Sequence, residues 1–243
     1  LAGTNSHDRR QGAEGVLGLL QVGPPEGCVV GGVLQAARQH GLTVDELTAS
    51  DVTQRFPGFR VPTGSVGVFE PAAGYLKVER CVLAHLAAAQ QHGAELRFGS
   101  AVRAWRPEGS GIAVELESGE VFRAAKLVIT AGPWAPQLLA DFHLKLHVRR
   151  KHLYWFPNAE PAYEANRGCP TYLYELPQGV FYGFPQIDEL GVKVAEHSGG
   201  DVVDDPLTDP RALDAADLAR VEDFLERFLP VVGPAMQHRA VWL

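Results

Sequence analysis

The sequence predicts an α+β fold built from two intermingled units, and three observations lead to that class. Two segments with apolar residues at helical spacing, 78–92 and 213–229, stand far apart in the chain. Short strand-like runs separated by turns occupy 94–132 between them. A second series of such runs, within 144–196, is rich in β-branched and aromatic residues and is typical of an antiparallel meander.

The first quarter of the chain alternates short elements with turns. Residues 1–14 show no periodicity and predict an irregular N-terminus. The apolar run 15–23, closed by two prolines, predicts a buried strand, and the spacing in 30–40 predicts a helix that ends at the following glycine. Residues 43–51 predict an extended piece and the start of a short helix. Prolines and glycines then predict a turn-rich connection over 57–64.

The middle of the chain gives the clearest patterns. In the helix predicted over 78–92, Val78, Val82, Leu86 and Ala89 share one face, and a glycine follows as a helix end. The next strands are expected over 94–98, 101–105, 112–116, 121–123 and 126–132, the last being an apolar strand that ends in glycine and leads to a short helix over 134–139.

The last part predicts strands followed by one helix. The strands are expected over 144–156, 172–176, 180–184 and 192–196. The helix predicted over 213–229 ends at a proline, which cannot continue it. Its inward face should carry Leu218, Val221, Phe224, Leu225 and Phe228.

Composition excludes several classes of protein. A formal net charge of -7 argues against nucleic-acid binding, which needs a basic face. No apolar run reaches the roughly 20 residues that span a bilayer, and the polar N-terminus does not have the pattern of a secretory signal. The three scattered cysteines do not form a disulfide framework, which favours a reducing, cytoplasmic location.

Some local patterns have both a functional and an ordinary interpretation. Glycines within 12–18 are spaced as in a phosphate loop, but a charged stretch precedes them where the dinucleotide fingerprint requires a strand. His143, His147 and His152 could hold zinc from a helix, yet the residues between the first two alternate like a strand, on which they would not converge. No Gly-x-Ser-x-Gly elbow occurs. We therefore expect no metal site and no serine hydrolase.

Lys193 lies in an apolar strand, where an unpaired ammonium is costly. Its ordinary interpretation is a surface lysine on the solvent face of a half-buried strand. The aromatic residues of the neighbouring strands are most often core residues, but half of them should face the other side of the sheet. There they could form the apolar wall that a small amine substrate needs. These aromatic residues are Tyr154, Trp155, Phe156, Tyr172, Tyr174, Phe181, Tyr182 and Phe184.

Four segments carry a joint pattern that extends from about Gly15 to the last residue. They are Val68-Phe-Glu-Pro-Ala-Ala-Gly-Tyr-Leu76, Leu127-Val-Ile-Thr-Ala-Gly-Pro-Trp134, Pro177-Gln-Gly-Val-Phe-Tyr-Gly-Phe-Pro185 and Gly191-Val-Lys-Val-Ala-Glu-His197. In order and spacing they resemble the FAD-dependent amine oxidase family that contains monomeric sarcosine oxidase, N-methyltryptophan oxidase and peroxisomal sarcosine/pipecolate oxidase.

The resemblance implies two domains between which the chain crosses repeatedly. A substrate domain built on a large antiparallel sheet is expected to contain 15–75 and 143–235. Part of an FAD-binding, α/β-like domain is expected to contain 76–142 and 236–243.

The resemblance also implies the residues that contact FAD. Val102 corresponds to the position whose backbone contacts the adenine end. Ala131, Gly132 and Trp134 belong to the strand end that passes beside the dinucleotide, where a close approach requires a residue without a side chain at Gly132.

Three further residues are implied to form the site of oxidation. Lys193 corresponds to the lysine that sits over the flavin ring and promotes reduction of oxygen, since a fixed cation stabilises a developing superoxide. Tyr182 and His197 correspond to residues that line the substrate cavity. The implied reaction oxidises the C–N bond of a secondary amino acid such as sarcosine to an imine, with oxygen reduced to hydrogen peroxide.

The sequence also departs from the family pattern. The Gly-x-Gly-x-x-Gly unit that holds the FAD pyrophosphate is absent, as is the Gly-Phe-Ser-Gly-His-Gly segment that closes over the flavin. Trp242 stands where covalently flavinylated members carry cysteine, so any FAD is expected to be non-covalent. The alternative is a truncated, non-catalytic domain that binds no FAD and self-associates through exposed sheet edges. We expect the isolated chain to be inactive.

Overall fold

The structure is a computed structural model that describes residues 14–158, 160–230, 232–233 and 235–243. It divides into two compact units. The larger draws its described residues from Leu1–Val78, Arg150–Asp201 and Pro210–Trp242, and the smaller from Glu79–Arg149, Val202–Asp209 and Leu243. Of the predicted irregular N-terminus, residues 1–13 lie outside the described residues, and with them Gly12, the first glycine of the motif, whereas Glu14 begins a strand.

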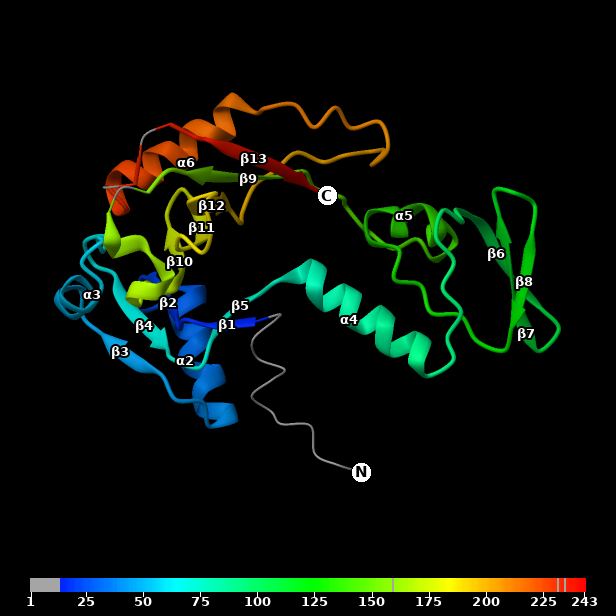
Figure 1. Ribbon diagram of the computed structural model, residues 1–243, viewed down its shortest axis with the longest axis horizontal. Coiled ribbons are helices and arrows are strands. Elements are labelled where there is room, and N and C mark those ends of the chain that lie inside the picture. The colour runs from blue at the N-terminus through cyan, green and yellow to red at the C-terminus, as the bar shows by residue number, and fades with distance from the viewer. Residues whose placement is uncertain (1–13, 159, 231, 234) are drawn as a thin grey trace. The chain divides into compact units, whose positions relative to one another are not determined.

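The larger unit is built on a mixed eight-stranded sheet (Figure 1). In spatial order its strands are β13 (His238–Trp242), β9 (Lys151–Phe156), β12 (Val192–Glu196), β11 (Gly179–Phe184), β10 (Thr171–Leu176), β2 (Leu19–Gly23), β4 (Val66–Glu70) and β3 (Asp45–Leu47). The pair β10–β2 is parallel and the other neighbours are antiparallel. A separate two-stranded sheet pairs β1 (Glu14–Val16) with β5 (Gly74–Leu76). The predicted meander is confirmed as β10, β11 and β12.

Three helices of this unit begin and end at residues that the sequence makes recognisable. The helix α2 (Cys28–His40) ends at Gly41, whose φ of 65° suits glycine. The helix α3 (Ala49–Arg55) begins with a capping box between Thr48 and Asp51. The helix α6 (Ala215–Phe228) begins at Asp214, whose carboxylate accepts from two backbone N–H groups. Two 3₁₀ turns, η3 (Pro161–Tyr163) and η4 (Ala165–Arg167), precede β10.

One face of the eight-stranded sheet forms the core, and α6 packs against it. Alternate strand residues point to this face, and they are fully or almost fully buried. The predicted inward face of α6 is confirmed, with Phe224 stacked on Phe181 at 4.7 Å between ring centroids. The core includes Leu20, Val22, Tyr154, Phe156, Tyr172, Tyr174, Phe181, Val192, Val194, Val221, Phe224, Leu225 and Phe228.

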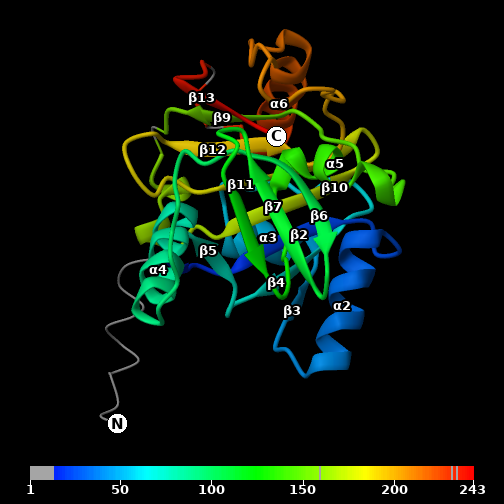
Figure 2. The same ribbon diagram turned by 90° about the vertical axis from the view of Figure 1, so that its right-hand side faces the viewer.

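The opposite face of the sheet is covered at one end by α2, which lies against β2 and β4 (Figure 2). There Gln21 and Val68 are buried. The strands β11, β12, β9 and β13 continue this face beyond α2. We call this part the open face and define it by Trp155, Tyr182, Phe184, Lys193 and Trp242, all of which retain exposed surface in the described structure.

The smaller unit contains the helix α4 (Val78–Gln91), which starts at the boundary, and the three-stranded sheet β6 (Val102–Glu108), β7 (Gly111–Leu116) and β8 (Val121–Ala124). The turns η1 (Gly132–Trp134), α5 (Ala135–Leu138) and η2 (Ala140–Phe142) follow. Trp105 joins sheet and turns, because its Nε1 donates to the carbonyl of Leu138 at 2.8 Å and its ring stacks on Phe142.

The predicted apolar face of α4 forms, but none of its residues is buried in the described structure. Of that face, Val78 is 47% and Val82 50% exposed. The predicted helix is confirmed, whereas burial of its apolar face is not observed in the described structure.

Two strands predicted in the smaller unit are absent from the described structure. Residues 94–98 follow α4 without pairing, and there Arg97 bonds Glu95 and Glu120 and packs over the ring of Phe122. Residues 126–132 also form no strand, since no described strand pairs with them, and Val128 is 82% exposed.

The strand predicted from residue 144 begins only at Lys151. His143 has a φ of 51°, and a tight turn joins Leu146 N to Leu144 O at 2.9 Å, so the backbone there is not extended. Strands β4, β5 and β13 were not predicted. The last of these places residues 238–242 in the eight-stranded sheet, although 236–243 were expected to belong with 76–142.

Candidate functional site

Three of the predicted site residues lie together on the larger unit. Tyr182 is on β11, Lys193 is on β12, and His197 follows β12 directly. In the ladder, Lys193 is opposite Phe184 and Tyr182 is opposite Ala195. Because side chains alternate along a strand, this register places the three residues on the same face.

Lys193 is surrounded by aromatic rings. Its Nζ lies 5.1 Å from the ring centroids of both Trp155 and Phe184 and 5.8 Å from that of Trp242. These distances are within the range of cation–π attraction, which favours the charged ammonium in an apolar place. The side chain is half-buried and lies on the open face of a strand whose other residues are buried.

Next to this lysine is a cavity of 230 Å³. Tyr182 and His197 contact each other edge to face at 6.1 Å between ring centroids. Burial raises the pKa of the Tyr182 phenol, so it stays protonated at neutral pH. The cavity is lined by Leu19, Gly74, Thr171, Tyr172, Leu173, Tyr182, Gly183, Phe184 and His197. It is therefore mainly apolar, with a few polar groups at defined positions.

A tyrosine from the core face supports this site through the sheet. The Tyr172 hydroxyl donates to the backbone carbonyl of Lys193 at 3.1 Å. It occupies the place of a side chain at Gly183, where an added Cβ would lie 2.2 Å from that hydroxyl and 2.1 Å from the same carbonyl. Sequence reasoning missed this support because it depends on a glycine and a tyrosine paired across two strands.

The four residues implied to contact the cofactor belong to the smaller unit. Val102 begins β6, and it is 40% exposed, as is Trp134 in η1. Gly132 has a φ of 54°, and no protein atom lies within 4 Å of an added Cβ. The backbone conformation thus favours glycine, and the described residues, apart from its chain neighbours, leave the space beside Gly132 uncovered. Ala131, just before it, is half-buried.

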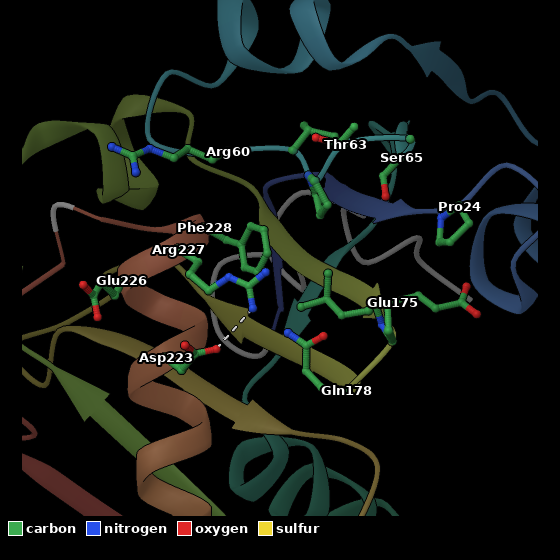
Figure 3. Close-up of a pocket in the computed structure, with 15 residues that line it drawn as sticks. Pro24, Arg60, Thr63, Ser65, Glu175, Gln178, Asp223, Glu226, Arg227 and Phe228 are labelled. Carbon is green, nitrogen blue, oxygen red and sulfur yellow. Dashed lines mark hydrogen bonds and ion pairs between the residues drawn. The ribbon is translucent and has the colours of Figure 1, made fainter.

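A second groove, of 860 Å³, is larger but contains none of the predicted site residues (Figure 3). It runs between residues 60–65, the β10–β11 turn and the end of α6. Its facing charges include Arg227 and Asp223, which pair at 3.4 Å. We place the candidate site at the smaller cavity, because Tyr182, His197 and Lys193 lie there on the same face of the sheet.

No group of three or more potential metal ligands occurs among the described residues. Of the three histidines considered for zinc, His152 is buried on the core face. In the described part of the chain no helix has the length and apolarity needed to cross a bilayer.

The fold is shared with a solved amino acid oxidase. The open form of NikD, described as an unusual amino acid oxidase essential for nikkomycin biosynthesis, matches with a TM-score of 0.76 and 25% identity over 94% of this chain and 61% of its own. L-proline dehydrogenase from P. horikoshii shares the fold with a TM-score of 0.73, at 15% identity over 94% of this chain and 60% of its own.

The particular family follows from the sequence match. Residues 18–242 match the family described as FAD dependent oxidoreductase, and the chain belongs to it. Monomeric sarcosine oxidase from Streptomyces avermitilis is 35% identical over 88% of this chain and 56% of its own length. N-methyl-L-tryptophan oxidase from Citrobacter koseri is 31% identical over 89% and 57%. The chain thus spans a little over half the length of the relatives it matches.

Each unit, taken by itself, has a feature that suits part of an FAD molecule. The open face offers exposed aromatic surface around Lys193, which suits a planar ring system. The uncovered, side-chain-free backbone at Gly132 suits a close-lying dinucleotide. No Gly-x-Gly-x-x-Gly turn for the pyrophosphate occurs in the sequence.

Proposed function

We propose that this chain forms the substrate-holding part of an FAD-dependent oxidase that acts on a small secondary amino acid. The observation that carries the proposal is the aromatic-ringed Lys193 beside the Tyr182–His197 cavity. In the overall reaction the substrate loses two electrons and two protons from its C–N bond to give an imine. Oxygen gains them to give hydrogen peroxide, and the imine hydrolyses. Bound FAD would carry the electrons from the amine to oxygen.

The protein residues would bind and orient the reactants. Tyr182 keeps its phenolic proton at neutral pH and can donate a hydrogen bond to the substrate. Leu173 and Phe184 form apolar walls that exclude water. The Nζ of Lys193 would stabilise negative charge developing on oxygen, because a fixed cation is most effective where water is excluded.

The size of the cavity supports a small substrate. Its 230 Å³ lies below the roughly 300–1,000 Å³ of drug-sized ligand sites, which favours sarcosine or a small N-methyl or cyclic amino acid. On the smaller unit, Val102, Ala131, Gly132 and Trp134 would contact the dinucleotide, as the family resemblance implies.

We propose that FAD is held without a covalent bond. Trp242 lies on β13 with its ring 5.8 Å from Lys193 Nζ, and an indole cannot form the thioether that a cysteine forms. The thiols of Cys28 and Cys169 are free, which supports action in a reducing compartment such as the cytoplasm.

A non-catalytic domain is the second candidate, and one observation favours it. The smaller unit exposes Val82, Leu83 and Val128 by 50%, 64% and 82%. Uncovered apolar surface of this kind promotes association. Such a chain would hold no FAD and would oligomerise, which size-exclusion chromatography would show.

The deciding measurement is a visible absorbance spectrum of the purified chain, with and without added FAD, before and after denaturation. A flavin band that is retained through gel filtration and released by denaturation supports the proposal and its non-covalent form. In flavin-loaded protein, Lys193→Met should lower the rate of peroxide formation with sarcosine by at least about tenfold. Lys77→Met, a matched change at an exposed lysine, should leave it unchanged. Absence of any flavin band in excess FAD would favour the second candidate.

A further inference from the structure

The loop that follows β12 converges on one lysine. Lys151, the first residue of β9, donates from Nζ to the carbonyl oxygens of His197, Ser198 and Gly199 at 2.7, 2.8 and 2.6 Å. An ammonium has three N–H donors, and these three successive carbonyls match them in number. Carbonyl dipoles that point at one place repel each other, and a cation at their centre stabilises this arrangement.

The backbone of the loop is shaped to fit around that lysine. Gly199 and Gly200 have φ values of 70° and 86°, which favour glycine. A Cβ on Gly200 would lie 2.4 Å from the carbonyl of Arg150 and 3.3 Å from Cδ of Lys151. The loop therefore passes directly against the Lys151 side chain, with no space for a larger residue.

The other side of the loop is anchored independently. The Ser198 hydroxyl accepts from Val180 N at 3.0 Å and donates to Glu196 Oε1 at 2.8 Å. The other carboxylate oxygen of Glu196 accepts from Nε of Arg220 on α6 at 2.7 Å. His197 N donates to the carbonyl of Val180 at 2.6 Å. These bonds fix where the loop begins, and Lys151 fixes how it turns.

We propose that Lys151 is a positioning residue of the candidate site at the smaller cavity. Its ammonium holds the 197–200 turn in the conformation that sets the His197 imidazole against Tyr182 in the cavity. Lys151 does not line that cavity, so it acts through His197. The importance of this positioning for catalysis rests on the proposed function, but the positioning itself can be measured without flavin.

The test uses NMR on the 243-residue chain. Ring centroids 6.1 Å apart, edge to face, bring ring protons close enough for a nuclear Overhauser effect between His197 and Tyr182. The His197 signals are assigned by their loss in His197→Gln. The effect should be present in the wild-type chain and at least threefold weaker in Lys151→Met. It should be unchanged in Lys77→Met, which removes an exposed lysine of the same unit.

Chemical rescue distinguishes the loss of the Lys151 ammonium from general damage to the fold. Lys151→Cys treated with 2-bromoethylamine regains an ammonium at nearly the lysine length, and the equally treated wild-type chain controls for its own cysteines. Restoration of the His197–Tyr182 effect supports the proposal, even if Lys151→Met fails to fold. Full intensity in a folded Lys151→Met chain, or no restoration after alkylation, overturns it.

A second readout applies where flavin binds. Lys151→Met should raise KM for sarcosine about three- to tenfold with kcat changed less than twofold, because the enzyme must order one side chain on binding. If no flavin binds to any variant, the proposed function fails while the NMR result still decides the role of Lys151.

Discussion

The N-terminus of α2 is capped by Glu175, which is distant from it in the sequence, and this contact gives a quantitative prediction. The Glu175 carboxylate on β10 accepts from Cys28 N at 3.0 Å and Val29 N at 2.8 Å. The local N-cap, Gly27, makes no side-chain cap bond. Figure 3 shows Glu175 directed away from the groove that it borders. The carboxylate thus replaces a local cap and places negative charge at the positive helix end.

Removing this cap should destabilise the larger unit measurably. Loss of a helix N-cap costs about 0.5–2 kcal/mol, and the charge–dipole attraction adds about 0.3–1 kcal/mol near the surface. We expect Glu175→Ala to lower the free energy of unfolding by about 2 kcal/mol. Glu175→Gln, which keeps an acceptor but loses the charge, should cost about 1 kcal/mol, and less at high salt.

The position of Gly27 makes the prediction more specific. A Cβ there would lie 2.4 Å from Oε2 of Glu175, so Gly27→Ala must displace the carboxylate from its bonds. Gly27→Ala should therefore cost about 1 kcal/mol less in a Glu175→Ala background than in the wild-type chain.

Urea unfolding followed by far-ultraviolet circular dichroism and tryptophan fluorescence measures these differences. With a slope of about 2 kcal/mol per M, a change of 1 kcal/mol moves the midpoint by about 0.5 M. Glu26→Ala, which removes the exposed carboxylate next to the same helix start, is the control and should cost less than about 0.5 kcal/mol. If the effects of Gly27→Ala and Glu175→Ala add within about 0.3 kcal/mol, the capping contact is refuted.

Three other predictions concern the core, a thiol and the start of α6. Phe224 is fully buried and stacked on Phe181, so Phe224→Ala should lower the free energy of unfolding by about 3–5 kcal/mol in the same urea experiment. A loss below about 1 kcal/mol would contradict this packing. Burial raises the pKa of the Cys169 thiol to about 12, so at pH 8 dithionitrobenzoate should react with exposed Cys28 and reach Cys169 only after denaturation. Asp214→Ala should cost about 1 kcal/mol at pH 7. Hydrogen bonds from the N–H of Asp217 and Ala216 lower the pKa of the Asp214 carboxylate. Its contribution to the free energy of unfolding should therefore be full above its unfolded pKa near 4 and disappear as the pH falls through the lower folded value. Unfolding curves at pH 7 and pH 3 would detect this loss.

The sequence identified elements whose cause is local. Helix α6 was predicted with its inward residues, because an apolar stripe with a proline stop depends only on neighbours in the chain. The strand over 126–132 was wrongly predicted for the opposite reason. Its apolar composition describes a strand between partners, and the described residues provide none.

The difference between local patterns and contacts with distant partners also limits what the sequence could predict of the site. Lys193 was singled out by its apolar flanks, which are local. Its neighbours Trp155 and Trp242 could not be assigned to it, since they come from β9 and β13 and meet it only through the order of strands. Lys151 gave no signal at all, because its partners are backbone carbonyls that no sequence pattern marks.

The register between β11 and β12 makes the site sensitive to changes in chain length. A deletion of one residue inside β12 would turn Lys193 toward the aromatic core and present a valine on the open face, since successive side chains face opposite sides. The connection over 185–191 lies outside both strands and can change length without this inversion. Natural variants of this chain should therefore concentrate insertions in that connection, and the strands themselves should vary by substitution alone.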